Sequence, residues 1–326
     1  MTLLIISRRL LRSTLALLCL GLWATARAET PAAGAGGPAN PTPSGTAKPA
    51  ASCFNGKELP WPEPGAKEVE KLTSELRAQL PKETFCVLRV GPWIIATDLD
   101  EASAKHFAGS TIAIYAAQIQ KQLFTGTPRR EPVKVYLFKD HESYTKWNVK
   151  LFGERPSTPY GYYSRARKAL VMNIGTGGGT LLHEMAHAMA EADFEAIPAW
   201  LNEGLGSLFE ASGMDPNRKR VVGLTNWRLT GLQDDLKKNK AVRFAALLDM
   251  EDGTFYGADS GSNYASARYL MQYLQEQGKL EDFYTRIRDR KDEHPAAALR
   301  AVFENRFTVE EIEKACYAWV LTLRFR

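Results

Sequence analysis

Apolar positions divide the chain into a first region that contains strands and a second region of helices. Short apolar runs between turn residues predict strands, and the alternation is clearest in Val-Lys-Val-Tyr-Leu-Phe at 133–138. The predicted strands are 84–90, 93–97, 133–138, 160–164 and 169–174. Helical spacing predicts helices at 69–80, 101–124 and 141–151 in the same region.

From Pro198 onward the pattern is almost entirely helical. The predicted helices are 197–212, 229–239, 243–249, 263–277, 280–290, 295–304 and 308–322. The last begins with Thr308-Val309-Glu310-Glu311, which has the form of a capping box. The fold class predicted from both regions is α+β: a small N-terminal mixed sheet with helices, then a mostly helical C-terminal lobe.

The first residues have the pattern of a secretory signal peptide, predicted to span 1–28. Arginines precede an apolar stretch at 13–23 that is short for a membrane span, and Ala26-Arg27-Ala28 forms an A-x-A cleavage site. Residues 29–52 are rich in Ala, Pro and Gly, which predicts a disordered low-complexity tether. We therefore expect an exported protein, periplasmic or secreted, with an α+β lobe at 53–196 and a helical lobe at 197–326.

Charge and cysteine content narrow the possible partners. The predicted signal holds four of the 42 basic residues and no acid, which leaves 38 basic against 37 acidic residues. This balance gives no case for nucleic-acid or anionic-membrane binding, and no later segment is apolar enough to span a membrane. Cys53, Cys86 and Cys316 would remain in an exported chain. They allow one disulfide, whose pairing the sequence does not determine. The oligomeric state is equally open.

The strongest chemical signal is His183-Glu184-Met185-Ala186-His187. Two histidines four positions apart lie on one helix face, where both imidazoles can bind one metal ion. Glu184 is placed to contact a metal-bound water instead of the ion. Catalytic zinc usually has three protein ligands, so a third residue is expected. Glu203 is the candidate, because it lies on the next predicted helix among three core leucines (Leu201, Leu205 and Leu208). Gly204 and Gly206 follow it, which predicts that another element approaches the helix backbone closely there.

Together, His183-Glu184-x-x-His187 and Trp200-Leu201-Asn202-Glu203-Gly204 resemble the gluzincin zinc metallopeptidases. They are most similar to the peptidase MA-like bacterial family, which shares a Trp-Leu-x-Glu-Gly-Leu segment. The resemblance implies one zinc ion per chain held by His183, His187 and Glu203, with Glu184 as general base. Thermolysin-like gluzincins carry an aspartate four residues after the glutamate ligand to orient a histidine. This chain has Ser207 there, and Glu210 is a candidate replacement.

The resemblance also suggests how substrate is bound. Gluzincins pair substrate backbone with the edge strand beside the active helix, and Ala169–Ile174 takes the matching place. The Gly-rich run at 175–180 lacks the lysine of a phosphate loop, so we interpret it as a turn with Thr180 as the helix N-cap. Tyr264, at the start of a C-terminal helix, is the candidate oxyanion donor, although it could equally be a packing residue. The next candidates are Tyr269, Tyr160, Tyr162 and Tyr163.

These features predict a zinc-dependent hydrolase that cleaves peptide bonds in a peptide or protein substrate. Two alternatives remain: a catalytically inactive binding protein with the same fold, and a hydrolase of non-peptide amides. An intact Glu184 argues against an inactive site, because a binding protein needs no base. His106, His141 and His294 have no partners at metal spacing and are predicted to be surface residues. The cleft is expected between the two lobes.

Overall fold

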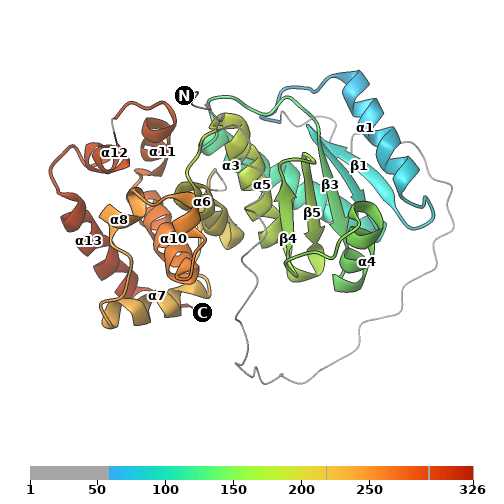
Figure 1. The fold of residues 1–326 in the computed structure, drawn as a ribbon. Helices are drawn as coiled ribbons and strands as arrows, with labels where there is room; N and C mark the ends of the chain where they lie inside the picture. Colours follow the sequence, from blue (N-terminus) through green and yellow to red (C-terminus); the bar gives the residue numbers. More distant parts are fainter. Residues whose placement is uncertain (1–58, 218, 293, 326) are drawn as a thin grey trace, which may run out of the picture. The chain divides into compact units, whose positions relative to one another are not determined.

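A five-stranded mixed sheet occupies the first half of the described chain (Figure 1). The computed structural model describes residues 59–217, 219–292 and 294–325, so the predicted signal peptide and tether lie outside the described residues. Strands follow the order β1-β2-β3-β5-β4. Their bounds are β1 Cys86–Val90, β2 Trp93–Thr97, β3 Val133–Phe138, β4 Gly161–Ser164 and β5 Ala169–Asn173. Strands β1–β2 and β4–β5 are antiparallel pairs, whereas β3 runs parallel to both of its neighbours.

The central strands are buried on both faces, because alternate side chains contribute to two separate cores. One core joins Ile94 and Val171 to the helices α1 (Ala66–Gln79) and α4 (His141–Phe152). The other core joins Ile95 and Leu170 to the helices on the opposite face. Near-continuous apolar runs such as Trp93–Thr97 therefore serve both layers.

Residues 101–122 form one long helix whose middle is π-helical. It consists of α2 (Glu101–His106), η1 (Phe107–Ala116) and α3 (Ala117–Gln122). The π-helical part packs against the start of α5 (Gly178–Asp193), the helix that carries the histidine pair. A short 3-10 turn, η2 (Ile174–Thr176), leads from β5 into α5. The predicted helix at 101–124 is thus confirmed, although its wide middle turns were not predicted.

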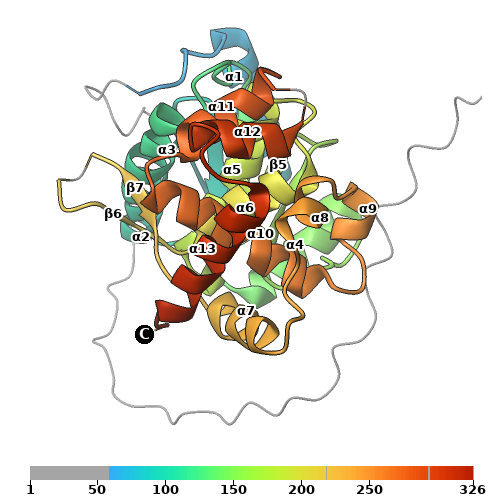
Figure 2. The ribbon, with the colours of Figure 1, turned by 90° about the vertical axis from the view of Figure 1, so that its left-hand side faces the viewer.

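The C-terminal part is mostly helical, which confirms the predicted α+β class. Its helices are α6 Ala199–Glu210, α7 Arg228–Lys237, α8 Phe244–Leu248, α9 Asp252–Phe255, α10 Ser260–Glu276, α11 Leu280–Arg288, α12 Pro295–Val302 and α13 Val309–Thr322. The capping box at Thr308 is present. Figure 2 views this region from the side and shows α13 packed across α10. The boundary predicted at 196/197 falls between α5 and α6, and the described residues on both sides belong to one compact unit.

Three local predictions were wrong. The pair β6 (Ser212–Met214) and β7 (Val221–Gly223) interrupts the helices after α6. The glycine-rich stretch before α10 contains α9, a single helical turn that is absent from the predicted helices. Thr180 is not the N-cap of α5: Gly177 takes that position without a side-chain cap, because the helix already begins at Gly178.

Helix α6 lies between α5 and α10, and its glycines permit both contacts. A Cβ atom on Gly204 would lie 3.1 Å from the backbone oxygen of Ala267 in α10. A Cβ atom on Gly206 would lie 2.9 Å from the His183 ring in α5. Two positions along a helix turn the side chain through roughly 200°, so the two glycines face opposite neighbours. The expected close approach to the backbone around Glu203 is therefore confirmed.

A buried carboxylate fixes the C-terminal end of α5. Asp193, the last residue of the helix, accepts hydrogen bonds from the backbone N–H of Thr127 at 2.7 Å and the Tyr284 hydroxyl at 2.9 Å. Its second partner on α11 is Arg288, whose Nη1 lies 3.0 Å from Oδ2. The side chain of Asp193 is completely buried. Asp193 thus ties the histidine helix to α11 and to the loop before β3.

We expect Asp193→Ala to destabilise the protein by about 2–4 kcal/mol, because the Tyr284 hydroxyl and the Thr127 N–H lose their acceptor and Arg288 loses one of its two carboxylate partners. The free energy of unfolding from chemical denaturation measures this effect. Asp289→Ala is the matched control, because Asp289 pairs with the same arginine at 2.7 Å but is 37% exposed. An exposed ion pair contributes about 0–1 kcal/mol. Equal losses for the two variants would contradict the role given to Asp193.

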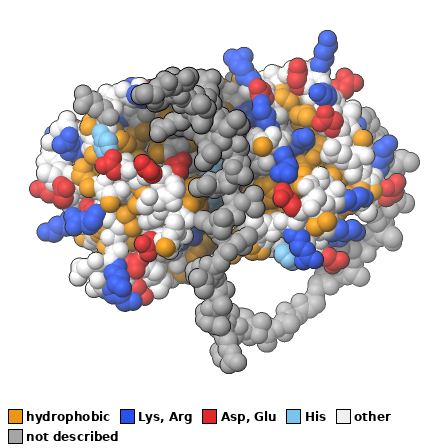
Figure 3. Space-filling model, in the orientation of Figure 1, with side chains coloured by type: hydrophobic (Ala, Val, Ile, Leu, Met, Phe, Trp, Pro, Cys, Tyr) orange, Lys and Arg blue, Asp and Glu red, His pale blue; other side chains and the backbone are white. Residues whose placement is uncertain are grey.

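The face of the molecule shown in Figure 3 carries both charges without separating them. On the face shown in Figure 3, basic and acidic side chains are interspersed over the sheet and helical regions. This distribution agrees with the near balance of charge in the sequence. Every helix within the described residues is too short or too polar to cross a membrane.

Candidate metal centre

The histidine pair lies in the middle of α5, as the spacing predicts. One turn separates His183 from His187, so their rings are neighbours, with centroids 4.6 Å apart and planes at 85°. Each side chain is 12% exposed. The core-facing positions of the same helix, including Met185 and Met189, are fully buried. The imidazoles therefore stand on the polar face of an otherwise buried helix.

Glu203 completes a three-residue group from the adjacent helix α6. Its Oε2 lies 3.3 Å from Nε2 of His183 and 3.5 Å from Nε2 of His187. One candidate ligand atom from each residue lies within 4.8 Å of the others. Two imidazole nitrogens and one carboxylate oxygen that converge in this way can hold a metal ion. Within the described residues no other group of histidines, cysteines and acids has this geometry.

Each imidazole is oriented by a partner on α6. The Nδ1 atom of His183 lies 3.2 Å from Oε2 of Glu210, and Nδ1 of His187 lies 2.9 Å from Oδ1 of Asn202. Because both partners contact Nδ1, the Nε2 atoms of the two rings are left facing Glu203. Glu210, the candidate replacement for the missing aspartate, does contact the His183 imidazole. The contact between Asn202 and His187 was not predicted, although the position of Asn202 next to Glu203 could have indicated it.

The charges of the group favour a cation between these residues. Burial opposes protonation of His183, but hydrogen bonds to Glu203 and Glu210 outweigh it and raise the pKa of His183 to about 10. Burial alone would also raise the pKa of Glu203, yet the two imidazoles hold it well below its usual range. The donor set therefore fits a divalent metal ion, which would compete with protons for the same nitrogens.

Glu184 lies beside the metal-binding group but outside it. Its Oε2 accepts a hydrogen bond of 2.8 Å from the backbone N–H of Tyr163 in strand β4. Burial raises the pKa of Glu184, and the neighbouring imidazoles only partly oppose this effect. A raised pKa suits a group that must take up a proton and release it near neutral pH.

A cleft of about 740 Å³ opens onto these residues. One wall comes from the segment before and within β4, and the opposite wall comes from α7 and α10, as expected for a cleft between the lobes. The lining residues are Thr158, Tyr160, Gly161, Thr176, Gly179, Thr180, His183, Glu184, Glu210, Trp227, Arg228 and Tyr264.

The edge strand beside this cleft is β4, which corrects the prediction for Ala169–Ile174. Strand β5 lies inside the sheet, hydrogen-bonded to β3 and β4 on its two sides. In an antiparallel pair, alternate residues point their N–H and C=O groups away from the partner strand. The N–H of Tyr163 points away from β5 and toward Glu184. Gly161, two positions earlier in β4, has its N–H and C=O on the same side of the strand. Gly161 thus presents backbone groups to the cleft.

Tyr264 lines the cleft together with His183 and Glu184. Burial and the Glu203 carboxylate raise the pKa of Tyr264, so its hydroxyl keeps its proton. Among the other predicted candidates, only Tyr160 also lines this cleft. Tyr269 is fully buried against Asn226, and the Tyr162 hydroxyl bonds to Asn148 at 2.8 Å. Tyr256 was not predicted, yet its hydroxyl donates to Oε1 of Glu203 at 2.9 Å.

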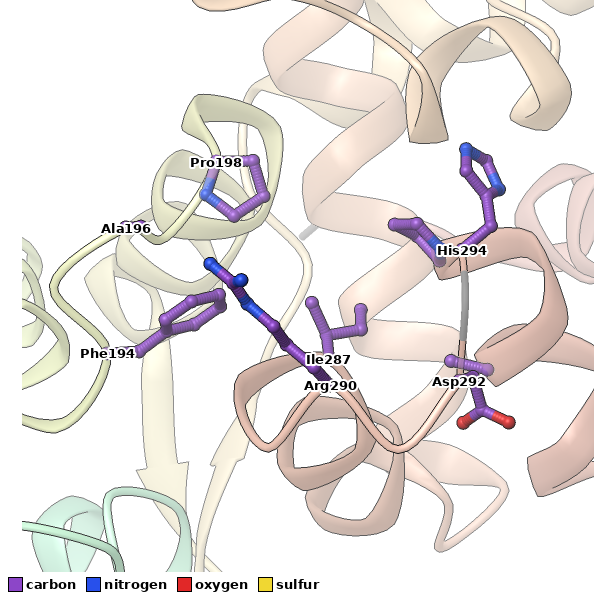
Figure 4. Close-up of a pocket in the computed structure, with 9 residues that line it drawn as sticks. Phe194, Ala196, Pro198, Ile287, Arg290, Asp292 and His294 are labelled. Atoms are coloured by element: carbon purple, nitrogen blue, oxygen red, sulfur yellow. The ribbon is translucent and has the colours of Figure 1, made fainter.

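A separate cavity of about 490 Å³ contains His294 (Figure 4). Figure 4 shows Arg290 reaching toward Phe194 and Pro198, with His294 on the other side of the cavity. The His294 ring contacts Asp249 at 2.8 Å and accepts from the backbone N–H of Ala296, so it caps α12. His106 and His141 are exposed, as predicted.

The two described cysteines, Cys86 and Cys316, are not part of the group formed by His183, His187 and Glu203. Cys316 is fully buried, its thiol contacts the backbone oxygen of Tyr269, and burial raises its pKa well above the usual value. Cys86 begins β1, and Cys53 lies outside the described residues. The disulfide pairing therefore stays undetermined.

Comparison with known families gives one match. Residues 179–297 are similar to a family described as a protein of unknown function (DUF1570). The matched segment contains His183, His187 and Glu203, and it also includes Glu184 and Tyr264. No curated protein matches the chain.

Proposed function

We propose that the protein is a zinc-dependent peptidase of the gluzincin type. The observation that carries the proposal is the convergence of His183, His187 and Glu203. His183 and the neighbouring acid Glu184 line one cleft. Two imidazoles and one carboxylate are the protein ligands of many catalytic zinc sites, in which the fourth position takes water or substrate. One zinc ion per chain would be held by these three residues.

Zinc in this position would supply Lewis acidity, which acidifies water and polarises a carbonyl group. Glu184 takes a proton from the attacking water while the water oxygen bonds to the scissile carbonyl carbon. The same carboxyl group then gives that proton to the amide nitrogen as the carbon–nitrogen bond breaks. The backbone N–H of Tyr163 holds the Glu184 carboxylate in place for both transfers.

Strand β4 would bind the substrate backbone by strand addition. Gly161 directs its N–H and C=O toward the cleft. Main-chain pairing of this kind supplies affinity with little dependence on sequence. A peptide or unfolded protein segment is therefore the proposed substrate. The exported location expected from residues 1–28 belongs to the same proposal.

The direct test uses the purified protein with unfolded proteins and peptide libraries. We expect cleavage that stops when a chelator removes the metal and returns when zinc is restored, with one zinc per chain by elemental analysis. Zinc-loaded protein that binds peptides without cleaving them would favour the inactive binding protein. Cleavage of small amides alone would favour the non-peptide amide hydrolase.

Tyr264→Phe is expected to lower turnover by about 10²–10³-fold, because a preorganised donor to the developing oxyanion is lost. Zinc content and thermal stability should stay close to those of the wild type, since the ring is retained. Steady-state kinetics on a cleaved peptide measure the effect. Tyr162→Phe is the control, because its hydroxyl bonds to Asn148 away from the cleft. Unchanged turnover in Tyr264→Phe would exclude Tyr264 as the donor.

A further inference from the structure

The carboxylate of Glu203 has different partners on its two oxygens. Oε2 faces the Nε2 atoms of both histidines at 3.3 and 3.5 Å. Oε1 accepts a hydrogen bond of 2.9 Å from the Tyr256 hydroxyl. The Glu203 side chain is only 10% exposed, so water has little access to either oxygen. The Glu203 carboxylate also interacts with the Tyr264 hydroxyl. Tyr256 is the partner that donates to Oε1, and it therefore favours the rotation in which Oε2 faces the imidazoles.

The segment that contains the single turn of α9 contacts α6 at two points, and these contacts position Tyr256. Asp252, the first residue of α9, accepts the backbone N–H of Ala199 at 2.9 Å, and Ala199 is the first residue of α6. Tyr256 directly follows α9 and contacts Glu203. The two contacts are four residues apart on both segments, or about one turn. Residues 252–256 thus run alongside the first turn of α6.

Aromatic packing holds this segment in place. Phe255 is fully buried, and its ring contacts that of Tyr256 edge-on at 5.4 Å. Phe255 also contacts the Tyr264 ring at 5.1 Å. The Tyr256 ring can therefore keep its position without the hydroxyl, so a phenylalanine in its place retains the ring packing and removes the hydrogen bond to Glu203.

We propose that Tyr256 is a positioning residue for the metal: it holds Glu203 so that Oε2 alone is presented as the ligand, and in this way it raises metal affinity. The inference rests on the proposed metal-dependent function. Orienting a ligand before the ion arrives lowers the entropy cost of binding. Partners that orient a metal ligand typically contribute about 10–100-fold in affinity.

The test is the affinity of Tyr256→Phe for Zn²⁺, measured by competition with a chromogenic chelator. We expect the dissociation constant to rise by about 10–100-fold. Tyr162→Phe, which removes a hydroxyl far from Glu203, should bind zinc as the wild type does. Wild-type affinity in Tyr256→Phe overturns the inference. A lower unfolding temperature of the metal-free variant with unchanged zinc affinity also overturns it, because the hydroxyl would then serve only stability.

A double-mutant cycle tests whether Tyr256 acts through Glu203. In a Glu203→Ala background, Tyr256→Phe should have no further effect on zinc affinity, and an undiminished effect there would overturn the inference.

The measurement of zinc affinity does not depend on hydrolysis. If the protein binds zinc but cleaves no peptide, the proposed function is refuted. The zinc affinity of Tyr256→Phe still tests the role of Tyr256 in that case. Cleavage with unchanged affinity in Tyr256→Phe would refute only the role of Tyr256.

Discussion

Replacing Glu184 with glutamine is expected to lower turnover by about 10²–10⁴-fold while zinc stays bound. Glutamine keeps the shape of the side chain and can still accept the N–H of Tyr163, which lies 2.8 Å from the native carboxylate. It cannot take a proton from water. The proposed metal ligands are other residues, so the metal content should not change. Peptide hydrolysis and elemental analysis on the same preparation measure the two effects.

The matched control is Glu191→Gln, which makes the same substitution two turns further along α5. Glu191 pairs with Arg165 at 3.0 Å and is absent from the lining of the cleft. The turnover of Glu191→Gln should stay within a factor of a few of the wild-type value. If Glu184→Gln itself retained turnover in that range, water would have to be activated by another group, and the proposed mechanism would fail.

Removal of Glu203 should have the second large effect, on metal binding. Glu203→Ala deletes one of three protein ligands and leaves the two imidazoles without the nearby carboxylate that balances their charge. The loss of affinity should exceed the roughly 10–100-fold that follows loss of a partner outside the ligand set. Zinc retained after dialysis against a weak chelator measures it, and hydrolysis should disappear with the metal.

Glu195→Ala is the control for this variant, because Glu195 is an exposed acid in the α5–α6 connection. It should retain zinc as the wild type does. Full zinc retention in Glu203→Ala would remove Glu203 from the site, and the third ligand would have to come from elsewhere.

The parts of this protein that the sequence could predict are those determined by local spacing. Strands such as 133–138 show in their apolar pattern, and the histidine pair shows in its one-turn separation. Glu203 could be proposed because it lies on the helix immediately after the pair. Glu210 could be proposed because it ends the same helix on the side of the ligand. All of these relations hold within one or two adjacent elements.

The features that escaped prediction depend on contacts between distant parts of the chain. Strand order is one example: β4 is the edge strand because β5 inserts between it and β3, and neither strand's own sequence shows this. Tyr256 contacts Glu203 across 53 residues. The turn of α9 carries a glycine, which disfavours helix, yet its attachment to α6 through Asp252 overrides that preference.

The short connection between α5 and α6 has a consequence for how the centre assembles. Both histidines and Glu203 lie within the segment 183–203, on two helices joined by residues 194–198. The entropy cost of closing a chain grows only slowly with length, by about 0.6 kcal/mol per doubling, and is small for so short a segment. Gathering the ligands therefore needs little more than a helical hairpin. The contacts of Glu184 and Glu203 with Tyr163 and Tyr256 instead require the sheet and the α9 turn. Metal capture can thus precede the complete fold, whereas a competent base and an oriented carboxylate form only with it.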